Sequence, residues 1–581
     1  NFDLKLIKQL FEPILMTTTV PEKCVSEGSV EIYVASEKVF YNPVQEFNRD
    51  LSIAVLNVFA SEYKEEKLQK YVDVVLLEAL SATGLRSLRY AKEVENLTKV
   101  VANDMCEEAV TTIRDNVVHN EVEDKIEVSL ADATILMYKH REAKLRFAAV
   151  DLDPYGCPTM FLDAAVQCVQ DGGLLLVTAT DMAVLAGNSP ESSYSKYGAI
   201  SLKTKSCHEM ALRILLQSIE RHAIKYGRYI VPLLSVSVDF YIRVFVKVYT
   251  GAKQCKHSCS KMSMVYLCTG CDNVVLQPLI KIKPAPTEKN PNMEKAHLPT
   301  LTPVGEFCDN CKQRYHLGGP IWSGPLHDEA FVSRVLMWVQ ARPDALATSK
   351  RLCGVLAVVR EELHDAPLYY CMTKLFGSAH LETMPIMLMR SAILNAGYRV
   401  SYSHASKTSI KTNAPQDFVW DIVRTWAKTH PARPAKLESD ARARNILSHE
   451  IRHAVELTRR DDANPDSRRR AALRFQHNPA PHWGPGNRAA GLIRHRGKYL
   501  SNPQVFVSGL DVCETEVSRS FLIPSTQDLY LSMGLNYVCV SWVCLFIYHQ
   551  LPLLGRLLDI GLSYGTPLRS ISVPSHPTSA L

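Results

Sequence analysis

The sequence lacks features that mark secreted proteins. It shows no convincing signal peptide, and most of its sixteen cysteines lie singly in apolar surroundings, which argues against a disulfide-stabilised scaffold and fits a reducing compartment. Apolar and charged residues make up 46% and 22% of the 581 residues, as in an ordinary soluble globular protein. A chain of this length is too long for one core and predicts about two to four domains.

The net charge of the whole chain is small, but one segment is strongly basic. The net charge is only +6. Between residues 433 and 498, however, 15 Lys and Arg stand against 7 Asp and Glu, an excess larger than that of the whole chain. The remainder is therefore slightly acidic. This asymmetry indicates a polyanionic partner for the basic segment.

The beginning of the sequence is atypical. It starts with Asn1, so we expect a fragment or a processed end. Residues 1–15 have amphipathic spacing, but they contain Asp3 and Glu12 and no arginine. This composition disfavours a transit peptide.

The last part of the sequence contains a long uncharged run. Residues 529–555 contain no Asp, Glu, Lys or Arg, and the run is long enough for a membrane span. Gly534, Asn536 and Pro552 weaken that interpretation. A tail anchor, a buried or partner-binding segment and a C-terminus not native to the folded protein all stay open. We favour the last and expect no membrane attachment.

Apolar runs alternate with helical patterns between residues 71 and 249. Strands are expected at 72–77, 99–102, 126–130, 147–151 and 173–178, with two further β-rich runs at 229–236 and 240–249. Helices are expected at 85–94, 106–120, 159–170 and 206–226. Such alternation is typical of an α/β fold, in which helices cover both faces of a parallel sheet.

Acidic residues recur where the predicted strands end: Glu78, Asp104, Asp132 and Asp153. One such residue is most simply a solvated strand end, but four in register would line the crevice where open α/β sheets bind ligands. The turn from Glu78 to Gly84 has a single glycine and lacks the G-x-G-x-x-G fingerprint, which favours a nucleoside cofactor without a pyrophosphate. Asp104 is placed to bind ribose hydroxyls, and Asp132 could accept a hydrogen bond from an adenine amino group.

The hexapeptide from Asp151 to Gly156, Asp-Leu-Asp-Pro-Tyr-Gly, follows a buried strand. Its carboxylate can accept a hydrogen bond from an amino group, its proline fixes the turn, and its aromatic ring offers a flat face for a base. The alternative is an ordinary turn, because a strand that ends in an Asp-Pro turn is common. The neighbouring acids favour the functional interpretation.

These motifs resemble the class I S-adenosylmethionine-dependent methyltransferases. More specifically, they are similar to the tRNA guanine-N2 dimethyltransferases, which modify guanosine 26. The stretches that carry the resemblance are 40–50, 79–89, 101–104, 151–156, 180–188 and 194–198, and matching stretches extend to about residue 488. The resemblance implies transfer of methyl groups to N2 of a tRNA guanosine. A tRNA-binding or chaperone protein without catalysis and an N-methyltransferase acting on DNA or protein are the alternatives.

The resemblance also implies a division of the chain. The expected parts are an N-terminal extension (1–30), a Rossmann-like methyltransferase domain (31–250), a zinc-knuckle element with a flexible insert (251–327), a smaller α/β C-terminal tRNA-binding domain (328–432), a basic segment (433–498) and an atypical apolar tail (499–581). Helical patterns at 333–340, 354–363, 385–395 and 417–429 and a strand at 398–404 agree with an α/β C-terminal module.

Individual roles follow from the same resemblance. Residues expected to bind S-adenosylmethionine are Arg49, Glu78, Ala79, Ser81, Thr83, Gly84, Arg86, Asp104, Asp132 and Ala133. Arg49 would hold the methionine end of the cofactor. Asp153 would orient the guanine amine and take up its proton, the carbonyl of Pro154 would be a second acceptor, and Tyr155 would stack on the base.

Two C-x-x-C motifs lie 36 residues apart: Cys268, Cys271, Cys308 and Cys311. Two such knuckles make a tetrahedral zinc site, and four thiolates leave no open position, so the site is expected to be structural. The insert at 281–303 is rich in Pro, Lys and Asn and is expected to be a flexible loop. Four unrelated thiols are the alternative, and Cys255, Cys259 and His316 are competing ligands.

The basic segment combines clustered arginines with aromatic residues. Arginine clusters contact phosphates with a strong salt dependence, and aromatic rings anchor bases by stacking. The expected RNA-binding residues are Arg468, Arg469, Arg470, Phe475 and Trp483. A solvated surface stretch is the alternative. We expect tRNA as the partner and no obligatory protein partner. The expected location is the nucleus, the mitochondrion or both, with the cytoplasm as an alternative.

Overall fold

The computed structural model describes residues 24–33, 41–67, 73–238, 240–300 and 303–475. All of them belong to the first of two compact units, which runs from Asn1 to Cys513. The expectations for the transit peptide, for Trp483 and for the apolar tail lie outside the described residues. Within the described ranges, no helix combines the length and apolarity that crossing a membrane requires.

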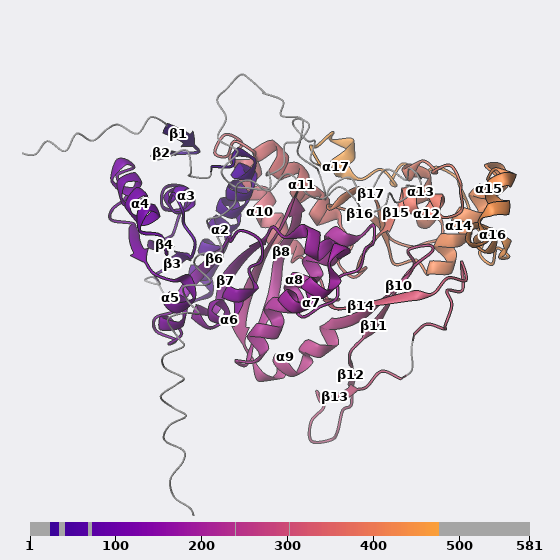
Figure 1. Cartoon of the computed structure of the whole chain (residues 1–581), viewed down its shortest axis with the longest axis horizontal. Helices are drawn as coiled ribbons and strands as arrows, with labels where there is room; N and C mark the ends of the chain where they lie inside the picture. The colour runs from indigo at the N-terminus through magenta and orange to yellow at the C-terminus, as the bar shows by residue number, and fades with distance from the viewer. Residues whose placement is uncertain (1–23, 34–40, 68–72, 239, 301–302, 476–581) are drawn as a thin grey trace, which may run out of the picture. The chain divides into compact units, whose positions relative to one another are not determined.

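A seven-stranded sheet forms the centre of the fold, with the strand order β5-β4-β3-β6-β7-β9-β8 (Figure 1). Its strands are β3 (Val75–Glu78), β4 (Lys99–Asp104), β5 (Ile126–Leu130), β6 (Phe147–Leu152), β7 (Val169–Ala179), β8 (Arg228–Val238) and β9 (Tyr241–Thr250). Strands β3 to β7 pair in parallel, and β9 is antiparallel to both of its neighbours. The expected α/β fold with a central parallel sheet is confirmed.

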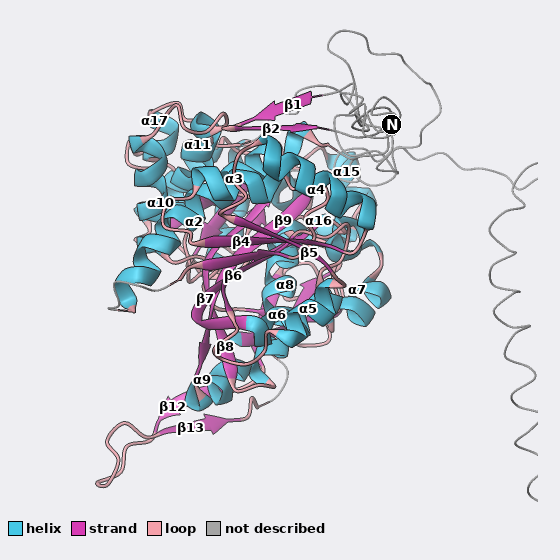
Figure 2. Cartoon of the chain, turned by 90° about the vertical axis from the view of Figure 1, so that its left-hand side faces the viewer, coloured by secondary structure: helices cyan, strands magenta, loops and turns pink. Residues whose placement is uncertain are grey.

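Helices cover both faces of this sheet (Figure 2). They are α2 (Glu46–Glu66), α3 (Leu85–Glu93), α4 (Glu107–His119), α5 (Ala133–Lys139), α6 (Thr159–Cys168), α7 (Pro190–Tyr197) and α8 (Cys207–Ile224). Successive strand residues point to opposite faces, so Leu76 joins the core beneath α2 and α3, whereas Leu77 joins the core beneath α6 and α8. The four helices expected here form within two residues of their predicted bounds, while the long α2 was not foreseen.

Smaller sheets and helices complete the described chain. The strands are β1 (Cys24–Glu27), β2 (Val30–Tyr33), β10 (Met262–Cys268), β11 (Val274–Pro278), β12 (Lys281–Pro284), β13 (Glu294–His297), β14 (Tyr315–Trp322), β15 (Tyr370–Cys371), β16 (Val400–Ser403) and β17 (Ser406–Thr412). The helices are α9 (Ala252–His257), α10 (Glu329–Ala341), α11 (Ser349–Glu361), α12 (Met372–Gly377), α13 (Ile386–Asn395), α14 (Gln416–Thr429), α15 (Pro434–Ser439), α16 (Ala441–Ser448) and α17 (Asp466–Arg469). Strands β11, β10 and β14 form one three-stranded sheet, and β15, β17 and β16 form another.

The insert between the two cysteine motifs is not the loop that we expected. Strands β12 and β13 pair antiparallel, and a bridge between Thr287 and Asn290 closes the hairpin. The prediction was wrong because the many Pro and Lys residues suggested a loop. Proline is nevertheless tolerated at the end of an edge strand, where its missing N–H removes no hydrogen bond between the strands.

The later helices are not packed apart from the central sheet. Buried residues of α10 and α11 belong to the same core as those of α2 and β8. In addition, the buried Lys411 ammonium lies 3.0 Å from Glu209 of α8 and 2.9 Å from Glu362. The proposed domain boundaries, including the one at residue 328, stay predictions.

Candidate functional site

The four strand-end acids lie at one edge of the sheet because the strands that precede them are parallel neighbours. The buried Asn103 holds three of these strand ends together. Its side-chain Nδ2 donates to the backbone carbonyls of Ala79 and Ala131, each at 3.0 Å. Its backbone carbonyl accepts from the N–H of Ser81 at 2.8 Å. This edge of the sheet is where α/β folds place ligands, next to the switch in strand order between β3 and β6.

The turn after β3 wraps around Asp104. Gly84 precedes α3 with φ +78°, and a Cβ at this position would lie 3.2 Å from Ile113. Asp104 accepts hydrogen bonds from the N–H groups of Ala82 and Cys106, each at 2.9 Å. Two backbone donors therefore orient a carboxylate that retains lone pairs for further donors such as hydroxyl groups. Ser81 and Thr83 lie in the same turn, and both are buried.

Asp132 stands at the start of the next helix. Its Oδ1 accepts from the N–H of Ile135 at 3.0 Å and so caps α5, and the residue is exposed. The adjacent Ala133 is buried. The cap fixes the direction of the Asp132 side chain, and its proposed contact with an adenine stays a prediction.

A buried arginine joins the acids of the site. Arg86 of α3 forms a short ion pair with Asp153 and lies 3.5 Å from Glu78 and 3.7 Å from Asp151. Its Nη1 also donates to Asn48 of α2 at 3.3 Å. We expected Arg86 to bind the cofactor; the structure pairs it with Asp153, and its contact with S-adenosylmethionine stays a prediction.

The two buried acids respond differently to this environment. Burial raises the pKa of Glu78 to about 7, although Arg86 opposes the shift. Burial acts on Asp151 in the same direction, but Arg243 at 2.9 Å, together with Arg86, holds the pKa of Asp151 below its usual value. The hydroxyl of Tyr90 donates to Asp151 at 2.6 Å. Arg243, Tyr90 and Asn48 were not foreseen, although an arginine within an apolar strand signals a buried carboxylate partner.

The Asp-Pro-Tyr-Gly turn presents its groups at the rim of the site. The Asp153 side chain is 20% exposed, Pro154 is buried, and Tyr155 is 73% exposed. Gly156, with φ +84°, donates from its N–H to the hydroxyl of Thr180 at 2.7 Å and accepts from the Thr180 N–H at 2.9 Å. These bonds fix the turn to the end of β7, so a half-buried carboxylate stands beside an outward-facing ring.

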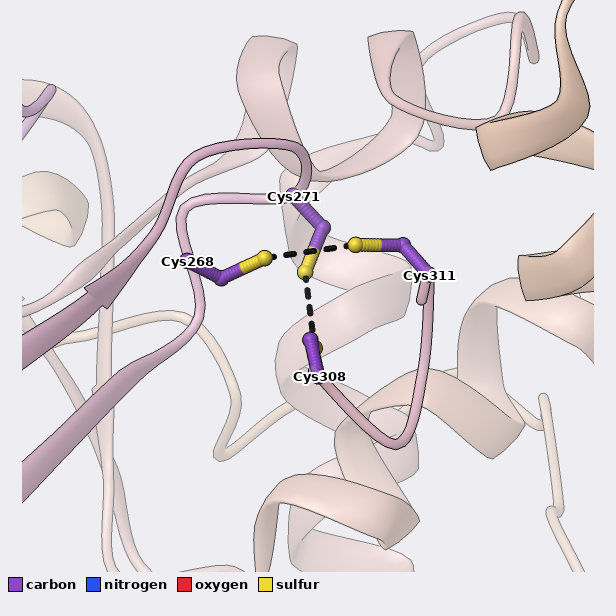
Figure 3. Close-up of side chains that lie close together, drawn as sticks. All are labelled: Cys268, Cys271, Cys308 and Cys311. Atoms are coloured by element: carbon purple, nitrogen blue, oxygen red, sulfur yellow. Dashed lines mark hydrogen bonds between the residues drawn. The ribbon is translucent and has the colours of Figure 1, made fainter. Parts of the chain in front are cut away.

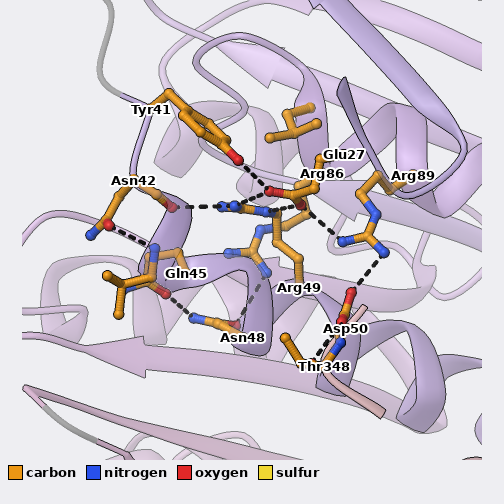
Figure 4. A network of polar contacts seen from close by, with 12 residues as sticks. Glu27, Tyr41, Asn42, Gln45, Asn48, Arg49, Asp50, Arg86, Arg89 and Thr348 are labelled. Atoms are coloured by element: carbon orange, nitrogen blue, oxygen red, sulfur yellow. Dashed lines mark hydrogen bonds and ion pairs between the residues drawn. The ribbon is translucent and has the colours of Figure 1, made fainter. Parts of the chain in front are cut away.

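Arg49 lies in a neighbouring network (Figure 4). It forms a short bidentate contact with Glu27, which also pairs with Arg89 at 2.9 Å. Arg89 in turn lies 2.7 Å from Asp50. Burial would raise the pKa of Glu27, but the two arginines lower it below its usual value. The structure therefore gives Arg49 a protein partner, and its contact with the methionine end of a cofactor stays a prediction.

The four cysteines of the two C-x-x-C motifs form one buried cluster (Figure 3). The Sγ atoms of Cys268 and Cys311 lie 3.2 Å apart and those of Cys271 and Cys308 lie 3.7 Å apart. All four Sγ atoms lie within 4.8 Å of one another. In the ranges that the structure describes, the cluster includes neither Cys255 nor Cys259 nor His316.

The two cysteine motifs have the same backbone hydrogen bonds. Asp272 donates to the carbonyl of Cys268 at 3.2 Å, and Lys312 donates to that of Cys308 at 2.9 Å. Both donors have positive φ, 60° for Asp272 and 57° for Lys312. The N–H groups of Cys268 and Cys308 each donate to the carbonyl five residues later, at 2.8 Å. Two similar turns thus point two thiols each toward one centre.

The basic segment is described as far as Phe475, so Trp483 lies outside the described residues. Its arginines at 468, 469 and 470 are exposed, with Arg469 paired to Asp466. Phe475 is half-buried, and its ring centroid lies 6.2 Å from that of Tyr402. Phe475 therefore contacts the protein, while the RNA contacts of Arg468, Arg469, Arg470 and Phe475 stay predictions.

Comparison with known proteins agrees with the geometry. Residues 19–424 match the model of a family described as N2,N2-dimethylguanosine tRNA methyltransferase. The chain belongs to this family. Its tRNA (guanine(26)-N(2))-dimethyltransferase relative from Drosophila melanogaster is 50% identical over 517 residues, which cover 83% of this chain and 89% of the relative. The enzyme of the same name from Homo sapiens is 46% identical and covers 81% of this chain and 78% of its own length.

A solved structure of the family is also similar. It is described as the complex of Trm1 from Pyrococcus horikoshii with S-adenosyl-L-methionine. The two proteins are 30% identical, with a TM-score of 0.57, and the match covers 70% of this chain and 99% of that one.

Proposed function

We propose that this family member transfers methyl groups from S-adenosylmethionine to N2 of guanosine 26 in tRNA, giving N2-methylguanosine and then N2,N2-dimethylguanosine. The observation that carries the proposal is the half-buried Asp153 carboxylate beside the exposed Tyr155 ring, at the ligand-binding edge of the sheet. The names of the Drosophila and human relatives and the S-adenosylmethionine complex of the Pyrococcus protein support the reaction and the methyl donor.

The chemistry requires a carboxylate at this position. The exocyclic amine of guanine is a poor nucleophile because its lone pair is delocalised into the ring. A carboxylate that accepts its N–H favours the pyramidal, more nucleophilic nitrogen and stabilises the positive charge that develops there. Asp153 performs this role and takes up the proton during or after transfer. The carbonyl of Pro154 is the second acceptor.

The exposed ring and the surrounding turn complete the site. Tyr155 stacks on a guanine that has been extruded from the folded tRNA, at a cost of a few kcal/mol. S-adenosylmethionine, when bound, supplies the methyl group. Asp104, already oriented by two backbone N–H groups, would hold the ribose, and Asp132 with Ala133 would lie at the adenine. Alignment of amine and methyl group supplies much of the acceleration.

The cysteine cluster fits a structural zinc ion. A zinc–sulfur bond of about 2.3 Å in a tetrahedron sets Sγ–Sγ separations of about 3.8 Å. Two Sγ pairs in the cluster are 3.2 and 3.7 Å apart, and the four thiols are buried without another partner of opposite charge in the described chain. Four protein ligands leave no position for water, so the ion would stabilise the fold and take no part in methyl transfer.

The remaining assignments extend the proposal to partners and location. The exposed arginines at 468–470 would contact tRNA phosphates, with no obligatory protein partner. A yeast relative that is 34% identical is named as the mitochondrial enzyme, which agrees with a location in the mitochondrion, the nucleus or both. The full set of strand-end acids and the arginine that holds Asp153 disfavour a tRNA chaperone without catalysis.

Replacement of Asp153 tests the proposal. Asp153→Asn keeps the shape of the side chain but removes its charge and its ability to accept the proton, so we expect methylation to fall about 10²- to 10⁴-fold. Binding of tRNA should change less than about threefold, since phosphate contacts dominate RNA affinity. Mass spectrometry of nucleosides from the treated tRNA measures both products. A tRNA with adenosine at position 26 should remain unmodified.

Asp124→Asn is the matched control because Asp124 is exposed and precedes β5, at the opposite edge of the sheet. It should methylate tRNA like the unaltered protein. Comparable product formation by the Asp153→Asn variant would overturn the assignment of Asp153. Failure of the unaltered protein to bind S-adenosylmethionine while it binds tRNA would instead favour the chaperone.

A further inference from the structure

The β12–β13 hairpin carries a charge pattern that the proposed reaction does not use. It projects beyond α9, away from the central sheet (Figures 1 and 2). Between residues 281 and 297 there are four lysines and two glutamates. The hairpin has little core of its own, because all residues of β13 and most of β12 are exposed.

The register gathers the positive residues on one face of the hairpin. Lys283 stands directly opposite Lys295, and Lys281 stands opposite His297. Because side chains alternate along a strand and cross-strand partners share a face, these four residues lie on the same side. Like charges directly opposite one another are unfavourable. Among the described residues, none of the three ammonium groups has an ion-pair partner.

The other face fixes the hairpin to the body of the protein. Glu294, which stands opposite Pro284, points to this second side. Its carboxylate lies 2.8 Å from Lys253 and 3.7 Å from His257, both on α9. One of the two glutamates is thus used in the attachment, and the lysine face has no carboxylate partner among the described residues.

Further positive charge lies on the body of the protein beside α9. A hollow beside α9 is lined by Arg221, Ile224, Lys225, Cys255 and Lys256. Its three cations come from the end of α8 and from α9, the helix to which Glu294 attaches the hairpin. Regularly spaced, uncompensated cations on a narrow arm match the spacing of charge on a nucleic-acid backbone better than the mixed charges of a protein surface.

We propose that the lysine face of the β12–β13 hairpin binds the phosphate backbone of the substrate RNA outside the target nucleotide. This inference rests on the proposed function for the identity of the RNA. The hairpin lysines would add affinity and orient the tRNA without contact with the reacting atoms. Their loss should therefore raise KM and leave kcat unchanged.

The test neutralises the three lysines together, as Lys281→Gln, Lys283→Gln and Lys295→Gln in one chain. Each lysine that contacts a phosphate contributes about one unit to the salt dependence, so the slope of log Kd against log salt should fall by about three. At 0.15 M salt we expect Kd and KM for tRNA to rise about tenfold, with kcat within about twofold. The variant should unfold at the same temperature as the unaltered chain because the side chains are exposed.

The matched control removes the same charge elsewhere, as Lys99→Gln, Lys125→Gln and Lys144→Gln. These lysines lie just before or at the start of β4, β5 and β6, at the edge of the sheet opposite the candidate active site. The control should match the unaltered protein in Kd and salt slope. Equal values for all three proteins would overturn the proposal, and so would equal losses in the control and the hairpin variant.

A second measurement does not depend on affinity. A full-length chain with the photo-reactive p-benzoylphenylalanine in place of Lys283 should crosslink to tRNA, whereas one with it in place of Lys144 should not. Crosslinks to protein alone, or none, would contradict an RNA-binding face. If the unaltered protein binds tRNA through the hairpin but forms no methylated guanosine, the proposed function fails while this inference stands.

Discussion

The carboxyl edge of the central sheet and the β12–β13 hairpin handle charge in opposite ways. At the sheet edge, Asp151 and Asp153 are neutralised within the chain by the buried Arg86 and Arg243, and burial favours the protonated form of Glu78 by raising its pKa to about 7. On the hairpin, exposed lysines face one another without a carboxylate in the described chain. A buried charge must find its partner within the protein because desolvation is costly. An exposed charge is solvated and can remain available to an external partner.

The cysteine cluster is an exception to the rule that buried charges are paired within the protein, because its buried thiols have no cationic partner in the described chain. If a zinc ion is that partner, metal analysis should find one zinc per chain, and Cys308→Ser should lose it. Structural zinc sites contribute folding free energy directly, so we expect a loss of several kcal/mol, seen as a lower unfolding temperature. Binding of S-adenosylmethionine should persist at a temperature where the variant is folded.

The control for this variant is Cys259→Ser, which alters a half-buried thiol outside the cluster. It should retain both the metal and the unfolding temperature. A protein that contains no metal and is unaffected by chelators would show that the four thiols are merely packed together.

Removal of the buried arginine tests whether burial sets the energy of an ion pair in this protein. Arg86→Met leaves Glu78 and Asp153 without their cation, and breaking a buried pair in this way costs about 3–5 kcal/mol. Arg469→Met breaks an exposed pair with Asp466 and should cost less than about 1 kcal/mol. Urea denaturation of both variants measures the difference. Similar losses of unfolding free energy in the two variants would mean that burial does not set the contribution of these ion pairs to stability.

The smallest effect concerns the titration of Glu78. Its pKa is raised by burial from 4.5 to about 7, so the folded protein keeps a proton that the unfolded chain releases. The stabilisation from this proton is fully present below pH 4.5 and is lost as the pH rises through 7. Relative to Glu78→Gln, the unaltered protein should therefore lose stability over this range, by about 1 kcal/mol per pH unit. Thermal unfolding at pH 5 to 8 compares the two, and parallel curves would contradict the shift.

Local patterns were sufficient to predict the main elements of the fold. Strand β5 formed at its predicted bounds, and β4 and β6 began where expected, because short apolar runs between helical patterns leave little choice of register. The acids that end these strands were found for the same reason. Helix α2 was missed because it is buried on all sides from Phe47 to Ala60, with the polar Asn48, Arg49, Asp50 and Asn57 among the buried residues, and so gives no amphipathic period.

Contacts between distant residues could not be predicted in the same way. Arg86 and Asp153 are 67 residues apart, and nothing in either local motif indicates that they pair. The ion pair of Arg49 with Glu27 depends on the short β1–β2 hairpin, which lies outside the expected motifs and was not predicted. Likewise, the lysines of the insert were visible as composition, but only the pairing of β12 with β13 places them on one face.

The sequence by itself determined the α/β class, the order of acids along the strand ends and the two cysteine motifs, because each depends on residues close together in the chain. Tertiary structure decided which charges neutralise one another and which stay exposed. That choice depends on burial and on distances between residues far apart in sequence, since the cost of an unpaired charge is set by its access to water. A residue of one type, such as lysine, is therefore a paired part of the core at one position, as Lys411 is, and an exposed side chain at another, as Lys283 is.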